Sequence, residues 1–207
     1  NGIRGVVALA DIEDGAELLF CPWELVIGST GIQDQMSGSD DMCKVVQSMA
    51  DEIRLGTDSL WYPYLDHIEL PRLAALWDQS TLDEFQGLPP SQDVTRHLRW
   101  FEQSCVGGGG HSGDDPATLQ SLVSFISRAS EVGMIPIYDL VNHHNGERNA
   151  KLSLTEAGAH LLVVGGPIQS GQEIYQSYGM KTAPTMYRDY GFVEDWPTCW
   201  NFKDAAL

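Results

Sequence analysis

The sequence predicts an α+β protein with a mainly β core and a long helical insertion. Near the start, Val6–Ala10 and Glu17–Phe20 are short runs rich in apolar residues, separated by a glycine-containing turn, which is typical of short strands. Leu152 and Leu154 alternate with polar residues, Glu156–Gly158 is a turn and His160–Val164 returns, a pattern typical of a β-hairpin. Between these regions, apolar residues recur at helical spacing. A chain of 207 residues suits one domain that carries such an insertion.

The composition excludes several classes of protein. The 43% of hydrophobic residues is enough for a sizeable core and too high for a disordered chain. No apolar run approaches the roughly 18 residues of a membrane-spanning helix. The net charge of -17, without a cluster of lysines or arginines, argues against direct binding of nucleic acid. The simplest role of this acidity is solubility, and the alternative is attraction of a basic protein segment.

The four cysteines give no sign of a metal site. They are widely spaced, without a Cys-x-x-Cys pair, at Cys21, Cys43, Cys105 and Cys199. We expect reduced thiols that pack in an intracellular protein, in the cytoplasm, nucleus or chloroplast. The chain opens at Asn1 without an initiator methionine or a signal-peptide pattern, and we expect it to be a fragment or a trimmed chain.

The first thirty residues are predicted to form a small meander. The glycines of Asn1–Gly5 permit a tight turn and close approach of the backbone to a neighbour. Asp11–Gly15 is a turn between the two strands, and Pro22 separates them from the apolar run Leu25–Ile27. No Gly-x-Gly-x-x-Gly motif opens a helix here, which excludes a dinucleotide-binding fold.

Residues 31–114 are predicted to be helical. Apolar residues at helical spacing predict a helix that begins at a cap formed by Asp40 or Asp41 and ends at Leu55. Further helical segments are expected at Leu70–Trp77, at Thr81–Phe85 and from Ser91 to Phe101, followed by a flexible glycine-rich linker at 106–113.

The last part of the chain, from residue 115, begins with a well-marked helix. Asp115 is a good N-cap and Pro116 suits the first helical position. Arg128 stands near the end of this helix, either as a partner of the helix dipole or aimed at a carboxylate. After the hairpin, a strand is expected at Ile174–Ser177 and a helical turn at Pro184–Asp189.

The stretch from Gly133 places three polar residues in an apolar setting. Asp139, Asn142 and His143 lie within five positions, beside apolar residues such as Ile135 and Val141. A buried polar group without a partner costs roughly 1–3 kcal/mol. These side chains therefore either satisfy one another and the backbone or face a ligand, and the residues alone favour neither. No further ligand at helical spacing accompanies His143, so we expect no metal.

Several motifs occur in the order of one known family. They are Gly2-x-x-Gly5, Asp11-Ile-x-x-Gly15, Ser127-Arg128, Asp139-Leu-Val-Asn142-His143, Gly171-x-Glu173-Ile-x-x-Ser-Tyr178-Gly179 and Tyr190-Gly-Phe-Val193. In this order the chain resembles the SET-domain protein methyltransferases. It is most similar to the branch of the Rubisco large-subunit lysine methyltransferase, which carries a long helical insert. The Asn-His and Tyr-Gly motifs are specific, whereas the glycine-rich start is not.

The resemblance implies a SET-domain fold, in which short β-sheets surround a knot-like C-terminal segment. It assigns residues 1–30 and 115–207 to the catalytic core and residues 31–114 to the helical insert. It implies S-adenosylmethionine as methyl donor, with Arg128 on the donor's carboxylate and Asn142 and His143 on its amine and adenine. The residues it implies for donor binding are Gly2, Ile3, Arg4, Gly5, Arg128, Asn142, His143, Tyr178 and Phe192. Tyr178 would be the active-site tyrosine, and Asp139, Tyr175 and Tyr190 would line the substrate channel.

The implied activity is protein-lysine N-methylation, in a narrow aromatic channel that holds the lysine of a protein substrate. Such a channel would favour the neutral amine by desolvation, because a free lysine has a pKa of about 10.4. The expected partner is a protein presenting a lysine, without nucleic acid or membrane, and a monomer is favoured. One alternative is a histidine methyltransferase of the same branch. Another is a non-catalytic SET-like interaction module, because the branch's C-terminal domain is missing after Leu207 and Met180–Met186 departs from the family pattern.

Overall fold

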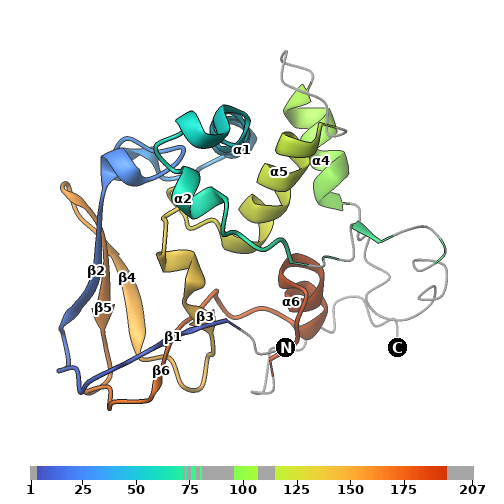
Figure 1. Ribbon diagram of the computed structural model, residues 1–207. Helices are drawn as coiled ribbons and strands as arrows, with labels where there is room; N and C mark the ends of the chain where they lie inside the picture. Colours follow the sequence, from blue (N-terminus) through green and yellow to red (C-terminus); the bar gives the residue numbers. More distant parts are fainter. Residues whose placement is uncertain are drawn as a thin grey trace.

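The computed structural model describes residues 4–71, 73, 76–77, 80, 96–106 and 115–194 of the chain. The strands form two small sheets at one end of the molecule, and most of the helices gather at the other (Figure 1). All regular elements in the described part of residues 31–114 are helical, as the sequence predicted. No helix of the described residues is both long and apolar enough to span a lipid bilayer.

The larger sheet is antiparallel and contains the predicted hairpin. Its order is β2 (Glu17–Pro22), β5 (Gly158–Val163) and β4 (Ala150–Leu154). The strands β4 and β5 pair with Leu152 opposite Leu161, so their apolar side chains share one face. A Cβ atom on Gly158 would collide with the carbonyl oxygen of Cys21, which explains a glycine where β5 begins.

The second sheet brings together segments from both ends of the chain. Its order is β1 (Val6–Val7), β6 (Glu173–Gln176) and β3 (Asn142–His143). β1 is antiparallel to β6, with Val6 opposite Ile174, and β3 is parallel to β6, with His143 opposite Gln176. The Asn-His pair therefore lies one strand away from the glycine-rich start of the chain.

The helices form a layer in which α1, α4 and α5 pack against one another. The main helices are α1 (Ser39–Leu55), α2 (Tyr62–Leu65), α4 (Arg96–Ser104), α5 (Pro116–Arg128) and α6 (Ala183–Tyr190). Buried Val46 of α1, Phe101 of α4 and Leu122 of α5 belong to one apolar cluster. A second cluster joins both sheets, through residues such as Leu161 and Ile174. Short 3₁₀ helices complete the fold: η1 (Trp23–Leu25), η2 (Ile32–Asp34), η3 (Gly56–Asp58) and η6 (Tyr138–Leu140).

The helix caps were predicted in part. Asp115 is the N-cap of α5 and accepts a hydrogen bond from the backbone N–H of Thr118 at 2.9 Å, as expected. The N-cap of α1 is Gly38 rather than Asp40 or Asp41, so that prediction is wrong by two or three positions. Asp41 still serves the helix start, because its carboxylate accepts the backbone N–H of Ser37 at 3.2 Å.

Some predicted segments lie partly or wholly outside the described residues. The expected helical turn at Thr81–Phe85, the cap at Ser91 and most of the glycine-rich linker belong to this group. The apolar run Leu25–Ile27 does not form a strand. Instead, Leu25 ends a 3₁₀ helix and Ile27 forms a single antiparallel bridge with Met134.

The prediction of four reduced cysteines is wrong for one pair. Cys43 of α1 and Cys105, immediately after α4, form a disulfide, with their Cα atoms 5.4 Å apart. Their separation of 62 positions carries no pairing signal in the sequence. The pair becomes apparent only when α1 and α4 pack side by side. Cys21 is a free, buried thiol whose pKa is raised by burial, and Cys199 lies outside the described residues.

We expect the disulfide to stabilise the helical layer substantially. Closing a loop across 62 positions should contribute about 4 kcal/mol to the free energy of unfolding, by restricting the unfolded chain. Denaturant unfolding of the oxidised protein and of the double variant Cys43→Ala/Cys105→Ala measures this difference. Reductant should destabilise the parent protein and leave the double variant unchanged. Equal sensitivity of both proteins to reductant would contradict the assignment.

Candidate active site

Two pockets meet at a wall formed by Arg128 and Asp139. The tyrosine pocket has a volume of about 470 Å³ and is named for Tyr138, Tyr178 and Tyr190 in its lining. The Asn142 pocket has a volume of about 280 Å³ and is lined by Arg4, Glu69, Leu70, Pro71, Arg128, Asp139, Leu140 and Asn142. Because Arg128 and Asp139 line both, the two pockets share one boundary.

This boundary is a buried ion pair between the end of α5 and η6. Arg128 Nη1 lies 3.1 Å from Asp139 Oδ2, and the Asp139 side chain is completely buried. Arg128 Nη2 donates a hydrogen bond of 2.8 Å to the carbonyl oxygen of Glu69, so the insert is held to the same group. Burial raises the pKa of Asp139, although the positive charge of Arg128 acts in the opposite direction.

One polar atom at this boundary, Arg128 Nε, has no hydrogen-bond partner among the described residues. The hydroxyl of Tyr64 and the carboxylate of Asp139 lie close to each other and interact. A buried donor without a partner is rare in folded proteins and calls for a water or a ligand group.

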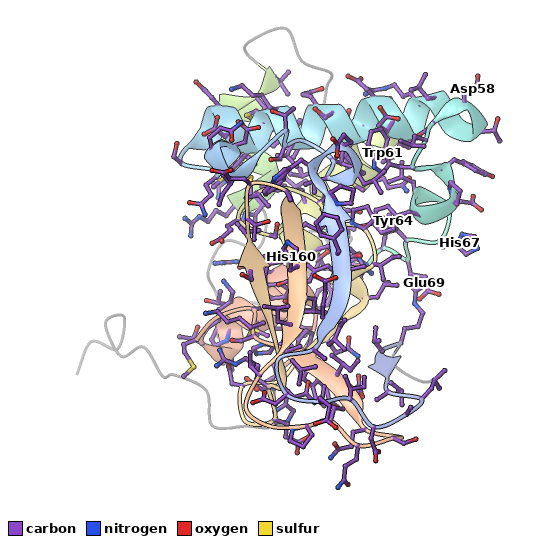
Figure 2. The ribbon with its side chains drawn as sticks, turned by 90° about the vertical axis from the view of Figure 1, so that its left-hand side faces the viewer. Asp58, Trp61, Tyr64, His67, Glu69 and His160 are labelled. Atoms are coloured by element: carbon purple, nitrogen blue, oxygen red, sulfur yellow. A yellow bond between two sulfur atoms is a disulfide. The ribbon has the colours of Figure 1, made fainter. Side chains whose placement is uncertain are left out.

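Tyr64 and Glu69 are the members of the site that sequence reasoning missed. Figure 2 shows them on the segment that descends from the end of α1 past α2 towards β1. Burial raises the pKa of Tyr64, and the nearby carboxylate of Asp139 raises it further. The sequence around Tyr64 is rich in aromatic residues, a pattern that is typical of core packing. Nothing in that pattern distinguishes the one tyrosine that reaches Asp139.

Asn142 joins the glycine-rich start to the rest of the site. Its side-chain amide donates to the carbonyl oxygen of Arg4 at 2.6 Å and to Glu173 Oε1 at 2.7 Å. A Cβ atom on Gly5 would collide with the Glu173 carboxylate and lie 2.7 Å from the Asn142 amide nitrogen. The backbone of residues 4–5 therefore approaches Asn142 as closely as only a glycine allows. Gly2 and Ile3, also predicted for this site, lie outside the described residues.

Tyr178 lines the tyrosine pocket and is held from several sides. Its hydroxyl donates a hydrogen bond of 2.9 Å to the carbonyl oxygen of Val141. Its ring lies 5.0 Å from the ring of His143 and 5.0 Å from that of Tyr190, measured between centroids. Burial raises the pKa of Tyr178 well above its ordinary value and that of Tyr190 to about 12. Both tyrosines are therefore neutral phenols at physiological pH.

His143 fastens the C-terminal segment onto this site. Its side chain is fully buried, and its Nδ1 accepts the backbone N–H of Tyr178 at 2.9 Å. Its Nε2 lies 3.1 Å from Glu194, which the backbone and side-chain amides of Asn145 also contact. Since Nδ1 is an acceptor, the proton of the neutral ring resides on Nε2 and is donated to Glu194. These contacts link the segment around Glu194 to the turn that follows β3.

Not all of the predicted site residues come together. Gln176 of β6 lines the tyrosine pocket, and Tyr175, its neighbour in the strand, lies on the opposite face of β6. The Tyr175 hydroxyl donates a hydrogen bond of 2.9 Å to Glu173, and the Tyr175 side chain lines a separate hollow. Phe192 lines neither of the two pockets and instead contacts the rings of His143 and Tyr190. Within the described ranges, no group of three or more potential metal ligands occurs.

Comparisons with known proteins identify the fold. No protein-family model matches the chain, and no curated protein matches it in sequence. Among solved structures, the SET domain of LSMT bound to lysine and AdoHcy matches 92% of this chain, with 23% identity and a TM-score of 0.62. Rubisco LSMT bound to AdoMet matches 93%, with 23% identity and a TM-score of 0.66. The chain covers 50% of each of these structures, about half their length.

A third structure, Rubisco LSMT bound to sinefungin and monomethyllysine, matches with 24% identity, a TM-score of 0.64 and 93% of this chain covered. The predicted SET-domain fold is therefore confirmed, with its short sheets and inserted helices. The two pockets, the Asn-His pair and Tyr178 belong to one compact region of that fold.

The clamp between His143 and Glu194 should weaken in acid. Burial lowers the pKa of His143, against the opposing effect of Glu194, so the unfolded chain binds a proton first as the pH falls. The stability that this residue contributes is present above about pH 6.5 and is lost as the pH falls below it. Burial opposes ionisation of Glu194, but hydrogen bonds from Asn145 outweigh it and lower its pKa, so its contribution is lost below about pH 4.5.

Thermal unfolding measured between pH 8 and pH 5 tests this expectation. The melting temperature of the parent protein should fall across this range, and the His143→Gln variant should be less stable at pH 8 but flatter with pH. The same pH slope in both proteins would show that another group is responsible.

Proposed function

We propose that this chain is an S-adenosylmethionine-dependent protein methyltransferase that transfers a methyl group to a lysine amine. The observation that carries the proposal is the wall shared by two pockets, formed by Arg128 and Asp139. A transfer reaction needs two ligands that meet at one point, and two pockets with a common boundary provide this arrangement. The proposal is supported by solved structures of the same fold that are bound to AdoMet and to lysine or methyllysine.

The Asn142 pocket is the proposed donor site, because its groups suit that ligand. Arg128 carries an unpartnered Nε in this wall, and a guanidinium is well suited to a carboxylate. Glu69 offers a carboxylate to an amine or to sugar hydroxyls, and the backbone at Gly5 allows close approach. When bound, the donor would supply a methyl group attached to a positively charged sulfur. Arg128, Asn142 and the backbone of residues 4–5 would orient it.

The tyrosine pocket is the proposed acceptor site, with Tyr178 as its central residue. Tyr178 stays protonated because burial raises its pKa, so it does not act as a general base. Its hydroxyl proton is already given to Val141, and the oxygen keeps lone pairs that can accept from an amine N–H or a methyl C–H. We therefore assign Tyr178 the role of positioning the reacting groups.

A histidine acceptor is the second candidate. The volume of about 470 Å³ lies within the range of roughly 300–1,000 Å³ that is usual for small-molecule pockets. Such a volume has room for an imidazole ring as well as for a lysine side chain. Charged residues, including Glu131 and Arg148, line it together with the tyrosines. Peptides with a central histidine should therefore be assayed beside lysine peptides.

The Tyr178→Phe variant tests the proposed function. It should bind the donor as the parent protein does but lose about 10²- to 10³-fold in turnover, since one positioned polar group at the reacting atoms is removed. Calorimetry with S-adenosylmethionine measures binding, and mass spectrometry of a lysine peptide measures methyl transfer. Tyr175→Phe is the matched control, because its hydroxyl belongs to the same strand region but lies outside the pocket. We expect Tyr175→Phe to keep full turnover.

Two outcomes would oppose this assignment. Full turnover of Tyr178→Phe would remove the assigned role of its hydroxyl. Absence of donor binding by the parent protein at millimolar concentration would favour the non-catalytic interaction module instead.

The Gly5→Ala variant tests the donor pocket separately. Its methyl group should displace Asn142 or Glu173 and break a hydrogen bond of 2.6 or 2.7 Å, which should weaken donor binding by about 2- to 10-fold. Gly38→Ala is the matched control, because a Cβ atom there meets no other atom within 4 Å. Unchanged donor affinity in Gly5→Ala would argue that the ligand binds elsewhere.

A further inference from the structure

Two of the positive charges that line the tyrosine pocket have no ion pair among the described residues. Arg148 and Lys151 line this pocket and are exposed, and neither has an ion-pair partner among the described residues. Lys181 Nζ stands 5.8 Å from the centre of the Tyr190 ring, which also lines the pocket. By contrast, Arg4, Arg54 and other basic residues of the described chain are paired with carboxylates.

This local excess contrasts with the charge of the whole chain. The chain has a net charge of -17 and only 12 basic residues. Two acidic residues, Asp139 and Glu131, line the tyrosine pocket. The carboxylate of Asp139 is paired with Arg128, whereas Glu131 has no ion pair among the described residues. The acidic side chains of Glu147 and Glu173 line the separate hollow beside Tyr175. Two exposed basic residues, Arg148 and Lys151, thus line the tyrosine pocket, against one acidic residue without a described ion pair.

We propose that the acceptor residue is presented by an acidic peptide segment, whose carboxylates bind Arg148 and Lys151 at the rim of the tyrosine pocket. This inference rests on the proposed function, and it names the class of substrate. Unpaired cations at a rim favour a ligand with the opposite charge and repel one of the same charge. A lysine within a basic segment would therefore be disfavoured here, contrary to the attraction of basic segments suggested by the net charge.

The same cations assist the proposed chemistry. The amine must be neutral to accept a methyl group, and nearby positive charges lower the pKa of an ammonium group. Acidic flanking residues would hold the segment at the rim, while the amine enters among Arg128, Lys151 and the tyrosines. The binding of the segment and the deprotonation of its lysine are then favoured by the same side chains.

An acidic peptide fits these observations better than a nucleic acid. Tight binding of nucleic acid requires many phosphate contacts from an extended basic surface. Here a few cations stand around one opening of a strongly acidic protein, which at longer range repels a polyanion. A short segment with a few carboxylates matches the extent of the charge.

Direct binding of three peptides tests this proposal. The peptides have equal length and one central lysine, flanked by glutamates, by glutamines or by lysines. Fluorescence anisotropy should rank the glutamate-flanked peptide as the tightest ligand and the lysine-flanked peptide as the weakest. The preference should shrink as salt is raised, because the charges involved are exposed.

Charge-neutralising variants locate the interaction. Arg148→Gln and Lys151→Gln should each weaken binding of the glutamate-flanked peptide by about 2- to 5-fold, and the double variant by about 10-fold. Lys44→Gln is the matched control, because it removes one positive charge from α1, where Lys44 pairs with Asp41. Lys44→Gln should keep the full preference for the acidic peptide. In turnover, the double variant should raise KM for this peptide and leave kcat nearly unchanged.

The outcomes separate this proposal from the one on which it rests. If the donor binds and lysine is methylated without preference for acidic flanks, the substrate inference is wrong and the enzyme remains. If the donor does not bind, the proposed function is wrong, whatever the peptide ranking. Equal effects of Lys44→Gln and the double variant, or tighter binding of the lysine-flanked peptide, would also overturn the inference.

Discussion

The arrangement of this site depends on one buried ion pair, between Arg128 and Asp139. Such a pair is weak evidence of stability, because desolvating two charges offsets most of their attraction. Removing one partner is costly, by about 3–5 kcal/mol, since it leaves an uncompensated charge in the interior. The pair therefore fixes geometry rather than adding stability. It holds the end of α5 against η6, binds the carbonyl oxygen of Glu69, and separates the two pockets.

The helical insert takes part in this site. Its Tyr64 and Glu69 approach the Arg128–Asp139 pair, and Figure 2 shows them along one continuous segment. The disulfide between Cys43 and Cys105 holds together the helices from which this segment departs. A structural change in the insert would therefore reach the wall formed by Arg128 and Asp139 directly. Variation of the insert is one way in which a protein of this fold could tune recognition without changing its sheets.

Much of the core could be predicted from the sequence because its signals are local. The β4–β5 hairpin follows from alternation of side chains, and the start of α5 follows from Asp115 and Pro116. The order of the motifs also predicted that Asn142 and Tyr178 lie in the site, and each lines one of the two pockets. What could not be predicted depends on packing between distant segments. The disulfide, the approach of Tyr64 to Asp139 and the outward position of Tyr175 require the three-dimensional arrangement of α1, α2 and β6.

The pairing of β1 with β6 has a consequence for folding. Val6 and its partner Ile174 lie far apart in the sequence, and the parallel pairing of β3 with β6 depends on the same strand. Contacts this remote in sequence form slowly, because a long loop must close before they are rewarded. β1 therefore stays without its partner until β6 has been synthesised, and the hydrogen bond from Asn142 to Glu173 can form only then.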